Sequence, residues 1–169
     1  MGVPHTVVEP LTLDRAEALA EGGDAFARVS GYTVAEGFLQ FPEALPATVR
    51  ALREGMDPEW FSHLVIDPST ATVVGMGGFA GPPTDGAVEI GYSIAPAHRG
   101  RGHATDAARR WIDIATARGA TLVVAHTLAE ENPSTAVLRR LGFHRTAEVT
   151  DPDAGAVWRW ELPTGGERR

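Results

Sequence analysis

The sequence predicts a single α/β domain built on a mixed, mostly antiparallel central sheet of about six or seven strands. Its centre should be a parallel strand–helix–strand unit, and further helices should flank the sheet. Three observations indicate this class: a length of 169 residues, short strand-like segments near both ends of the chain, and a long amphipathic helix between two apolar strands. We expect the domain to span residues 1–162 and a polar, flexible tail to follow over 163–169.

The first half of the chain alternates short strands with short helices. Residues 5–11 have the pattern of a strand, and a helix capped by Asp14 is expected to run to about Ala20, before two glycines. Turn residues then separate several short elements. These are helical pieces near 24–30 and 46–54, with breaks at Pro42 and Pro46, and a hairpin of strands over 60–66 and 72–79.

The second half contains the clearest periodic patterns. From Val88 to Ile94 apolar residues alternate with polar or small ones, which is typical of a strand. Apolar side chains then recur at helical spacing from Ala104 to Ala115. This helix is long enough to connect parallel strands, so strands 88–95 and 121–127 should be parallel neighbours. The remaining expected elements are a helix over 133–141 and a hairpin of strands 143–149 and 156–161.

Composition excludes several classes of chemistry. The chain has no cysteine, and all 15 basic residues are arginine, which excludes disulfides, thiolate metal sites, cysteine nucleophiles and lysine Schiff bases. The six histidines show no ligand spacing, so no metal is expected. A net charge of −7 argues against nucleic-acid binding and suits a cationic amine substrate, although it can also serve solubility alone. Without a long apolar run or a signal-peptide pattern, we expect a cytoplasmic protein that does not bind membranes.

The segment from Ile94 to Thr105 carries the strongest functional signal, because it joins a strand to the start of the long helix. The first amides of a helix have no internal partner, and the helix dipole adds positive charge there. Gly100 and Gly102 allow the backbone to curve so that several amides converge on one anion. The neighbouring arginines can add charge-assisted contacts. The pattern therefore favours a diphosphate site, with an ordinary solvated turn as the alternative.

The residues of this turn carry a family resemblance. Arg99-x-x-Gly102-x-Ala104 matches the signature (Gln or Arg)-x-x-Gly-x-(Gly or Ala) of the GCN5-related N-acetyltransferase (GNAT) superfamily. The strand before it and the later segments 125–128 and 137–143, the second ending in Leu-Gly-Phe, resemble the branch of ribosomal-protein N-terminal acetyltransferases. The resemblance covers about residues 86–146 and implies the mixed sheet of that superfamily.

The resemblance also implies acetyl-coenzyme A as co-substrate. It places the pantetheine arm along the signature strand, held by backbone groups of Tyr92, Ser93 and Ile94. Asn132 matches an asparagine that contacts the cofactor in the family, although it can also cap the next helix, and the two roles can coexist. Ser134 is a second candidate in the same place. The implied pyrophosphate turn comprises Arg99, Gly100, Arg101, Gly102, His103, Ala104 and Thr105.

An amine must lose a proton before it attacks a thioester, so a base or a water chain is required. Glu89 is the first candidate, because strand alternation places it on the same face as Gly91 and Ser93, which leave room beside it. Many relatives carry a glutamate at or near this position. The alternative is a strand glutamate on a solvated face. His126, which ends an apolar strand, is a further candidate base or acid, or else a packing residue.

The proton donor for the leaving thiolate departs from the family pattern. Many members use a tyrosine on the last helix, and the matching residue here is Leu138. Water or Ser134 is therefore the expected proton source. Because a thiol has a pKa of about 8.5, a thiolate leaves without much assistance.

The predicted function is acetyl transfer from acetyl-coenzyme A to a primary amine, either a protein N-terminus or a small-molecule amine. Two alternatives stay open, a non-catalytic acyl-coenzyme A sensor and a transferase for another acyl group. A homodimer is compatible with the sequence. Phe38, Phe41 and Trp60 are candidates for the wall of the acceptor pocket, because the family builds that wall from its N-terminal part.

Overall fold

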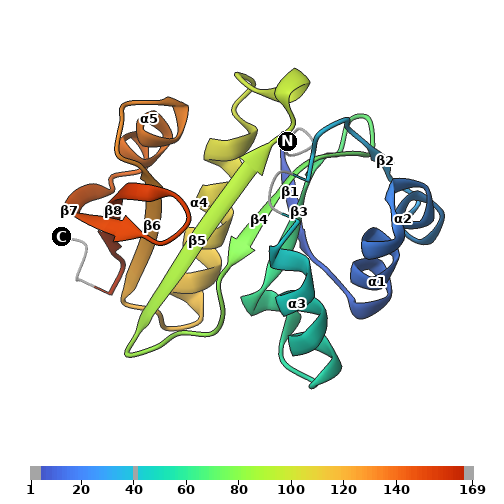
Figure 1. Cartoon of the computed structure of the whole chain (residues 1–169), viewed down its shortest axis with the longest axis horizontal. Helices are drawn as coiled ribbons and strands as arrows, with labels where there is room; N and C mark the ends of the chain where they lie inside the picture. The colour runs from blue at the N-terminus through green and yellow to red at the C-terminus, as the bar shows by residue number, and fades with distance from the viewer. Residues whose placement is uncertain (1–4, 40–41, 166–169) are drawn as a thin grey trace.

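The computed structural model describes residues 5–39 and 42–165, which form one mixed sheet with helices on both faces (Figure 1). The strands are β1 (Val7–Pro10), β2 (Thr33–Val34), β3 (Ser62–Asp67), β4 (Thr72–Phe79), β5 (Ala87–Ile94), β6 (Leu122–Leu128), β7 (His144–Asp151) and β8 (Gly155–Pro163). The helices are α1 (Leu13–Glu21), α2 (Gly23–Ser30), α3 (Ala44–Arg53), α4 (His103–Ala117) and α5 (Pro133–Arg140), with short 3-10 turns η1 (Pro58–Trp60) and η2 (Pro96–His98).

The strand order is β1-β3-β4-β5-β6-β8-β7, and β2 pairs with the start of β4. The neighbours β1–β3, β3–β4, β4–β5, β6–β8 and β7–β8 are antiparallel, whereas β5 and β6 are parallel and joined through α4. This arrangement confirms the predicted fold class and the expected parallel neighbours. It departs from the expectation by the additional two-residue strand β2, which is too short to produce a pattern in the sequence.

Two apolar cores lie on opposite faces of the first half of the sheet. Val65 and Val74 join the core around Trp111 of α4, whereas their strand neighbours Leu64 and Val73 join the core beneath α1, α2 and α3. Successive residues of a strand point to opposite faces, so this alternation places α4 on one face and α1–α3 on the other. The first half of the sheet is therefore covered on both sides.

The second half of the sheet is covered more sparsely. Leu138 of α5 and Trp160 of β8 join the core around α4. The edge strand β7 is exposed along almost its whole length, and His126 and Leu128 of β6 are exposed as well. In Figure 1 this part lies on the left, beyond β5, and α1–α3 lie on the right. One face of β6 and β8 is thus left open to solvent.

Three local expectations were wrong. Asp14 was expected to cap the first helix, but it lies in the first turn of α1 and Thr12 holds the N-cap position. Pro46 was expected to break a helix but lies inside the first turn of α3, where a backbone N–H would have no helical partner in any case. The tail was expected to start at Pro163, but β8 continues to that residue and Thr164 is buried. The Thr164 hydroxyl donates to the Ala120 carbonyl at 2.6 Å. The end of the expected tail, residues 166–169, lies outside the described residues. Within the described ranges, no helix is long and apolar enough to cross a membrane.

Candidate functional site at the opening between β5 and β6

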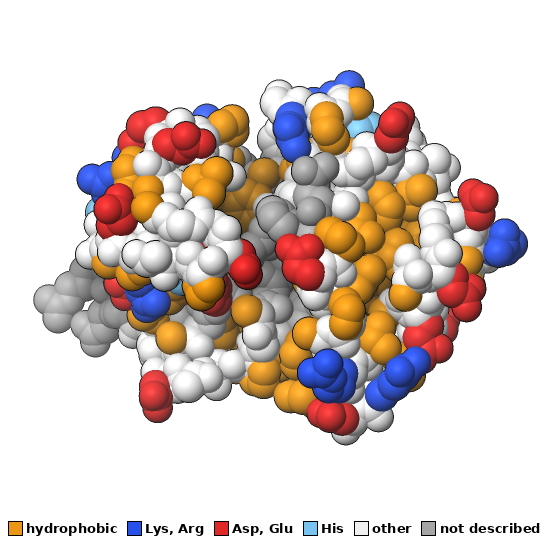
Figure 2. Space-filling view, viewed as in Figure 1, with side chains coloured by type: hydrophobic (Ala, Val, Ile, Leu, Met, Phe, Trp, Pro, Cys, Tyr) orange, Lys and Arg blue, Asp and Glu red, His pale blue; other side chains and the backbone are white. Residues whose placement is uncertain are grey.

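The parallel strands β5 and β6 separate after three paired positions. Residues 87–89 pair with residues 122–124, and within the described part of the chain the pairing of these two strands does not continue beyond Glu89. On its other side β5 stays paired with β4 as far as Ile94. The edge of β5 that faces β6 therefore lacks a strand partner over 90–94. In Figure 1 the two strands diverge toward the start of α4, and Figure 2 shows a cleft between the two lobes of the molecule.

The turn that follows β5 exposes backbone N–H groups at the start of α4. Within residues 5–39 and 42–165, the N–H groups from Gly100 to Thr105 have no hydrogen-bond acceptor. Gly100 and Gly102 have φ of +75° and +86°, and a Cβ atom on either would meet no heavy atom within 4 Å. The turn thus has free donors, a helix dipole behind them and open space in front. These properties fit an anionic ligand such as a diphosphate.

The side chains of this segment differ in what they can reach. The Arg99 Nε–H donates to the Ile94 carbonyl at 3.0 Å, so this arginine ties the turn to the end of β5. Arg101 is exposed and has no ion-pair partner among the described residues. The side chains of His103 and Thr105 are buried, with 1% and 7% exposure. These two residues therefore offer a ligand their backbone amides, whereas Arg101 can also offer its guanidinium group.

Two residues near the N-terminus contact this turn, and no pattern in the sequence indicated them. The His5 Nε2–H donates to the Arg101 carbonyl at 2.6 Å, across 96 residues of chain. Thr6 Oγ1 lies 2.9 Å from His103 Nδ1. Such contacts have no local sequence signal, because only the packing of β1 beside α4 creates them.

The candidate proton acceptors meet at the point where the strands separate. His126 Nδ1 donates to Glu89 Oε1 at 2.8 Å, so the two residues that were proposed independently form one pair. The Glu89 side chain is 47% exposed and the His126 side chain 29% exposed. A Cβ atom on Gly91, the next residue on the same face of β5, would meet no heavy atom within 4 Å. The pair therefore borders open space on the uncovered face of the sheet.

Tyr92 forms part of the opposite wall of the opening. Its ring packs nearly parallel to that of Trp111, with centroids 6.5 Å apart, and its hydroxyl donates to the Ser134 carbonyl at 3.4 Å. The contact connects β5 to the start of α5. Burial raises the pKa of Tyr92 well above the usual range of a phenol, so its proton is held firmly at neutral pH. The Ser134 hydroxyl has no partner among the described residues.

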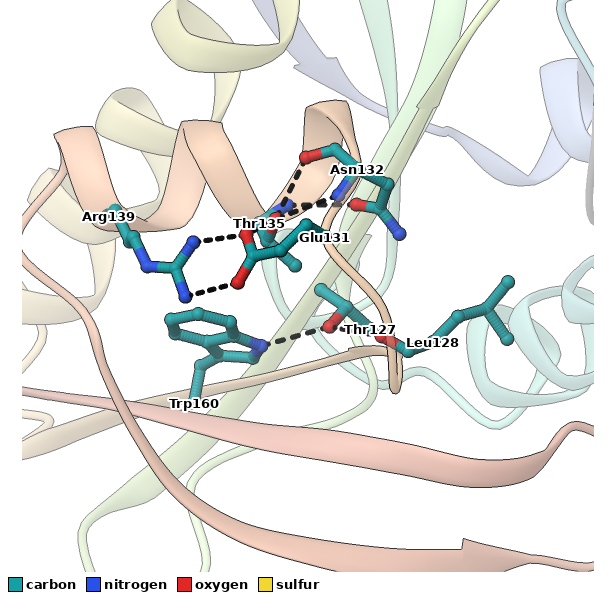
Figure 3. Close-up of polar contacts among 7 residues, drawn as sticks. All are labelled: Thr127, Leu128, Glu131, Asn132, Thr135, Arg139 and Trp160. Carbon is teal, nitrogen blue, oxygen red and sulfur yellow. Dashed lines mark hydrogen bonds and ion pairs between the residues drawn. The ribbon is translucent and has the colours of Figure 1, made fainter.

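Asn132 caps α5 (Figure 3). Its Oδ1 accepts the Thr135 N–H at 3.0 Å, and the Thr135 hydroxyl accepts the Asn132 N–H at 3.0 Å. Glu131, just before the cap, accepts hydrogen bonds from both terminal guanidinium nitrogens of Arg139. This pairing lowers the pKa of the Glu131 carboxyl. The capping role expected for Asn132 is therefore present. In Figure 3 its amide nitrogen points away from Thr135, and no described residue accepts a hydrogen bond from it.

Other expected features fall outside the opening. Leu138 is 1% exposed within the core, so this position offers neither a hydroxyl nor access. Trp60, a candidate for the acceptor wall, packs against Phe79 and beneath Arg118 at the far end of α4, about 22 Å along the helix from the turn. Phe38 is buried in the core beneath α1–α3, and Phe41 lies outside the described residues. The described residues contain no group of three or more side chains that could hold a metal ion.

The unpaired edge of β5 beside the amide-lined start of α4 fits an extended ligand that carries an anionic group. The model of the acetyltransferase (GNAT) domain family matches residues 7–144, and the chain belongs to this family of acetyltransferases. A curated relative, the uncharacterised N-acetyltransferase YjdG of Bacillus subtilis (strain 168), is 30% identical over 114 residues. The match covers 64% of this chain and 68% of the relative.

Solved structures share the fold at low sequence identity. Ribosomal-protein-S5-alanine acetyltransferase from Vibrio fischeri has a TM-score of 0.69 and 16% identity, over 100% of this chain and 98% of that one. A chimera of the spermidine N-acetyltransferase SpeG from Vibrio cholerae and hSSAT has a TM-score of 0.69 and 13% identity, over 95% of this chain and 96% of that one. The putative acetyltransferase yncA from Salmonella typhimurium, solved with its cofactor acetyl-CoA, has a TM-score of 0.63 and 18% identity, over 98% and 96%.

Proposed function

We propose that the protein transfers an acetyl group from acetyl-coenzyme A to a primary amine. The observation that carries this proposal is the row of amides from Gly100 to Thr105, which have no acceptor among the described residues and lie directly beyond the unpaired edge of β5. A ligand that combines an extended amide-containing arm with a diphosphate matches both surfaces at once. The presence of acetyl-CoA in the yncA structure supports this choice of co-substrate.

The binding roles follow from the two surfaces. The backbone of Tyr92, Ser93 and Ile94 pairs with the pantetheine arm in place of a strand, because no described strand pairs with the β5 edge that faces β6 at these residues. The amides of the turn bind the diphosphate, with added charge from the exposed Arg101. Asn132, at the start of α5, supplies a further amide donor, because the Tyr92 hydroxyl brings this end of α5 to β5. When bound, the co-substrate supplies a thioester carbonyl that an amine can attack.

Glu89 and His126 act on the acceptor as a pair. The acceptor arrives as an ammonium ion, and its nitrogen becomes a nucleophile only after it loses a proton. The pair accepts that proton at the floor of the opening, where space for the amine exists beside Gly91. As the carbon–nitrogen bond forms and the carbon–sulfur bond breaks, the nitrogen gives up its second proton, and water or the Ser134 hydroxyl relays a proton to the departing thiolate. The acceptor is a protein N-terminus or a small-molecule amine, and we propose that the reaction takes place in the cytoplasm.

A thiol-release assay tests the proposal. The full chain is mixed with acetyl-coenzyme A and a panel of peptides with free N-termini, polyamines and amine antibiotics, and free thiol is measured. We expect amine-dependent release with at least one acceptor class. No release from any acceptor would overturn the assignment, and faster release from another acyl-coenzyme A, such as succinyl-coenzyme A, would change the donor.

A non-catalytic acyl-coenzyme A sensor is the second candidate, and the buried Leu138 favours it, because this position offers no proton donor to the thiolate. Calorimetry distinguishes the two candidates. Tight binding of acetyl-coenzyme A without turnover of any amine would favour the sensor, whereas turnover that is lost in Glu89→Gln while binding persists would favour the enzyme.

A further inference from the structure

A stacked pair of histidines connects the start of the chain to the turn. The rings of His5 and His103 are 4.6 Å apart between centroids and 4° from parallel. His5 also donates from Nε2 to the Arg101 carbonyl at 2.6 Å. A backbone carbonyl can only accept, so the proton of this bond belongs to His5. The bond from His5 to Arg101 therefore holds the same short segment, Gly100 to Thr105, whose amides have no acceptor among the described residues.

The His5 contact decides which way a neighbouring amide points. The peptide bond between Arg101 and Gly102 is planar and trans, so the Arg101 carbonyl and the Gly102 N–H point in opposite directions. Holding the carbonyl toward His5 therefore directs the Gly102 N–H to the other side. Glycines on both sides of Arg101 leave the backbone free to rotate, and an untethered peptide at this place could turn over. The hydrogen bond removes that freedom.

His103 provides a fixed base for this tether. Thr6 donates to Asp106 Oδ2 at 3.3 Å, so the Thr6 hydroxyl accepts the proton of His103 Nδ1 at 2.9 Å. The chain of donors runs from His103 to Thr6 to Asp106, all packed at the first turn of α4. Burial lowers the pKa of His103, which keeps the ring uncharged beneath His5. His5 thus rests on a ring that cannot move independently of the helix.

We propose that His5 is a positioning residue for the diphosphate site, acting through the Arg101–Gly102 peptide and touching no ligand itself. The inference rests on the proposed function, because it assigns His5 a role in holding the co-substrate of that function. Through His5 the N-terminal segment contributes to co-substrate affinity, although this residue lies outside the signature motif around Gly102.

Calorimetry with free coenzyme A tests this role without requiring turnover. His5→Ala removes the donor and the stacked ring, and we expect the dissociation constant to rise about tenfold, the value of one ordinary hydrogen bond. His5→Gln keeps an N–H donor on a side chain of similar reach, and should recover most of the affinity. His144→Ala, an exposed histidine on β7, is the matched control and should bind as the parent does. Melting temperatures separate loss of positioning from loss of fold.

The outcomes are distinguishable from those of the proposed function. Parent-like affinity in a folded His5→Ala protein would overturn the role of His5 and leave the acetyltransferase proposal intact. Equal weakening in His5→Ala and His5→Gln would overturn the hydrogen-bond mechanism, because the donor would then be irrelevant. Failure of the parent protein itself to bind coenzyme A would overturn both proposals.

Discussion

The turn before α4 and the floor of the β5–β6 opening form the two ends of one site, but they are built from different groups. The turn presents backbone amides. The conformation that presents them depends mainly on the positive φ angles of Gly100 and Gly102. The floor presents the side chains of Glu89 and His126, brought together by the register of two strands. A backbone site is therefore sensitive to any side chain added at its glycines, whereas a side-chain site is sensitive to the chemistry of particular residues.

The largest effect on co-substrate affinity is expected at the turn. Gly102→Glu places a carboxylate where an anion should bind, and like charges about 4 Å apart repel by roughly 4 kcal/mol near a protein surface. We expect calorimetry to show a loss of coenzyme A affinity on the order of a hundredfold or more. Gly119→Glu is the matched control, because Gly119 has a similar φ of +88° and open space but lies past the other end of α4. Unchanged affinity in folded Gly102→Glu would remove the diphosphate from this turn.

The floor of the opening should respond in rate and not in co-substrate affinity. Glu89→Gln and His126→Ala should each lower kcat by roughly 10²–10⁴-fold, the usual contribution of a positioned acid–base group, with little change in coenzyme A binding. Raising the pH should shrink the defect, because an amine that is already neutral needs no base. Glu161→Gln on β8, whose carboxylate pairs with Arg159, is the control and should keep the parent rate. A pair of variants with full kcat would exclude Glu89 and His126 as proton acceptors.

A second comparison of glycines separates the site from the core that supports it. A Cβ atom on Gly77 would lie 2.3 Å from Trp111 Cη2 and 2.4 Å from the Gly91 carbonyl oxygen, whereas one on Gly91 would meet nothing within 4 Å. Gly77→Ala should therefore lower the free energy of unfolding by about 1–3 kcal/mol, as overpacking does. Gly91→Ala should change it by less than about 0.5 kcal/mol. Urea unfolding measures both, and equal stability of the two variants would contradict the packing around Trp111.

The smallest effect is expected in the pH dependence of stability. Burial lowers the pKa of His63 below its ordinary value of 6.5, and the same holds for His103. Near pH 6 the unfolded chain therefore binds protons that the folded chain does not bind. Stability is retained above about pH 6.5 and falls as the pH drops below it. The fall is at most about 1.4 kcal/mol per pH unit for each group. His63→Gln keeps a donor for the Glu59 carbonyl and should flatten part of this dependence. An unchanged slope between pH 7.5 and pH 5.5 in urea unfolding would contradict a buried neutral His63.

Much of the fold was predictable because its central elements carry local periodic signals. The alternation in β5 and the apolar face of α4 predicted a crossover between parallel strands, and the sheet has that connection. The elements that were missed have weak or misleading local signals. Two-residue β2 has no period to detect, and Pro46 is compatible with the first turn of a helix as well as with a break.

The candidate site divides in the same way. The free amides of the turn follow from glycines beside a helix start, both of which are local properties of the chain. The contact between Glu89 and His126, separated by 37 residues, depends on the β5–β6 register. The burial of Trp60 at the far end of α4 was equally invisible, because its neighbours come from β4 and from the end of α4.

The sequence by itself determined the order of the elements, the family and the position of an amide-lined turn, because periodicity and backbone freedom are encoded in neighbouring residues. Only the tertiary structure decided that His126 donates to Glu89 and that His5 holds the Arg101 carbonyl. Contacts between side chains distant in sequence depend on strand register and on packing across the sheet. Those are set by the whole core at once and not by any one segment.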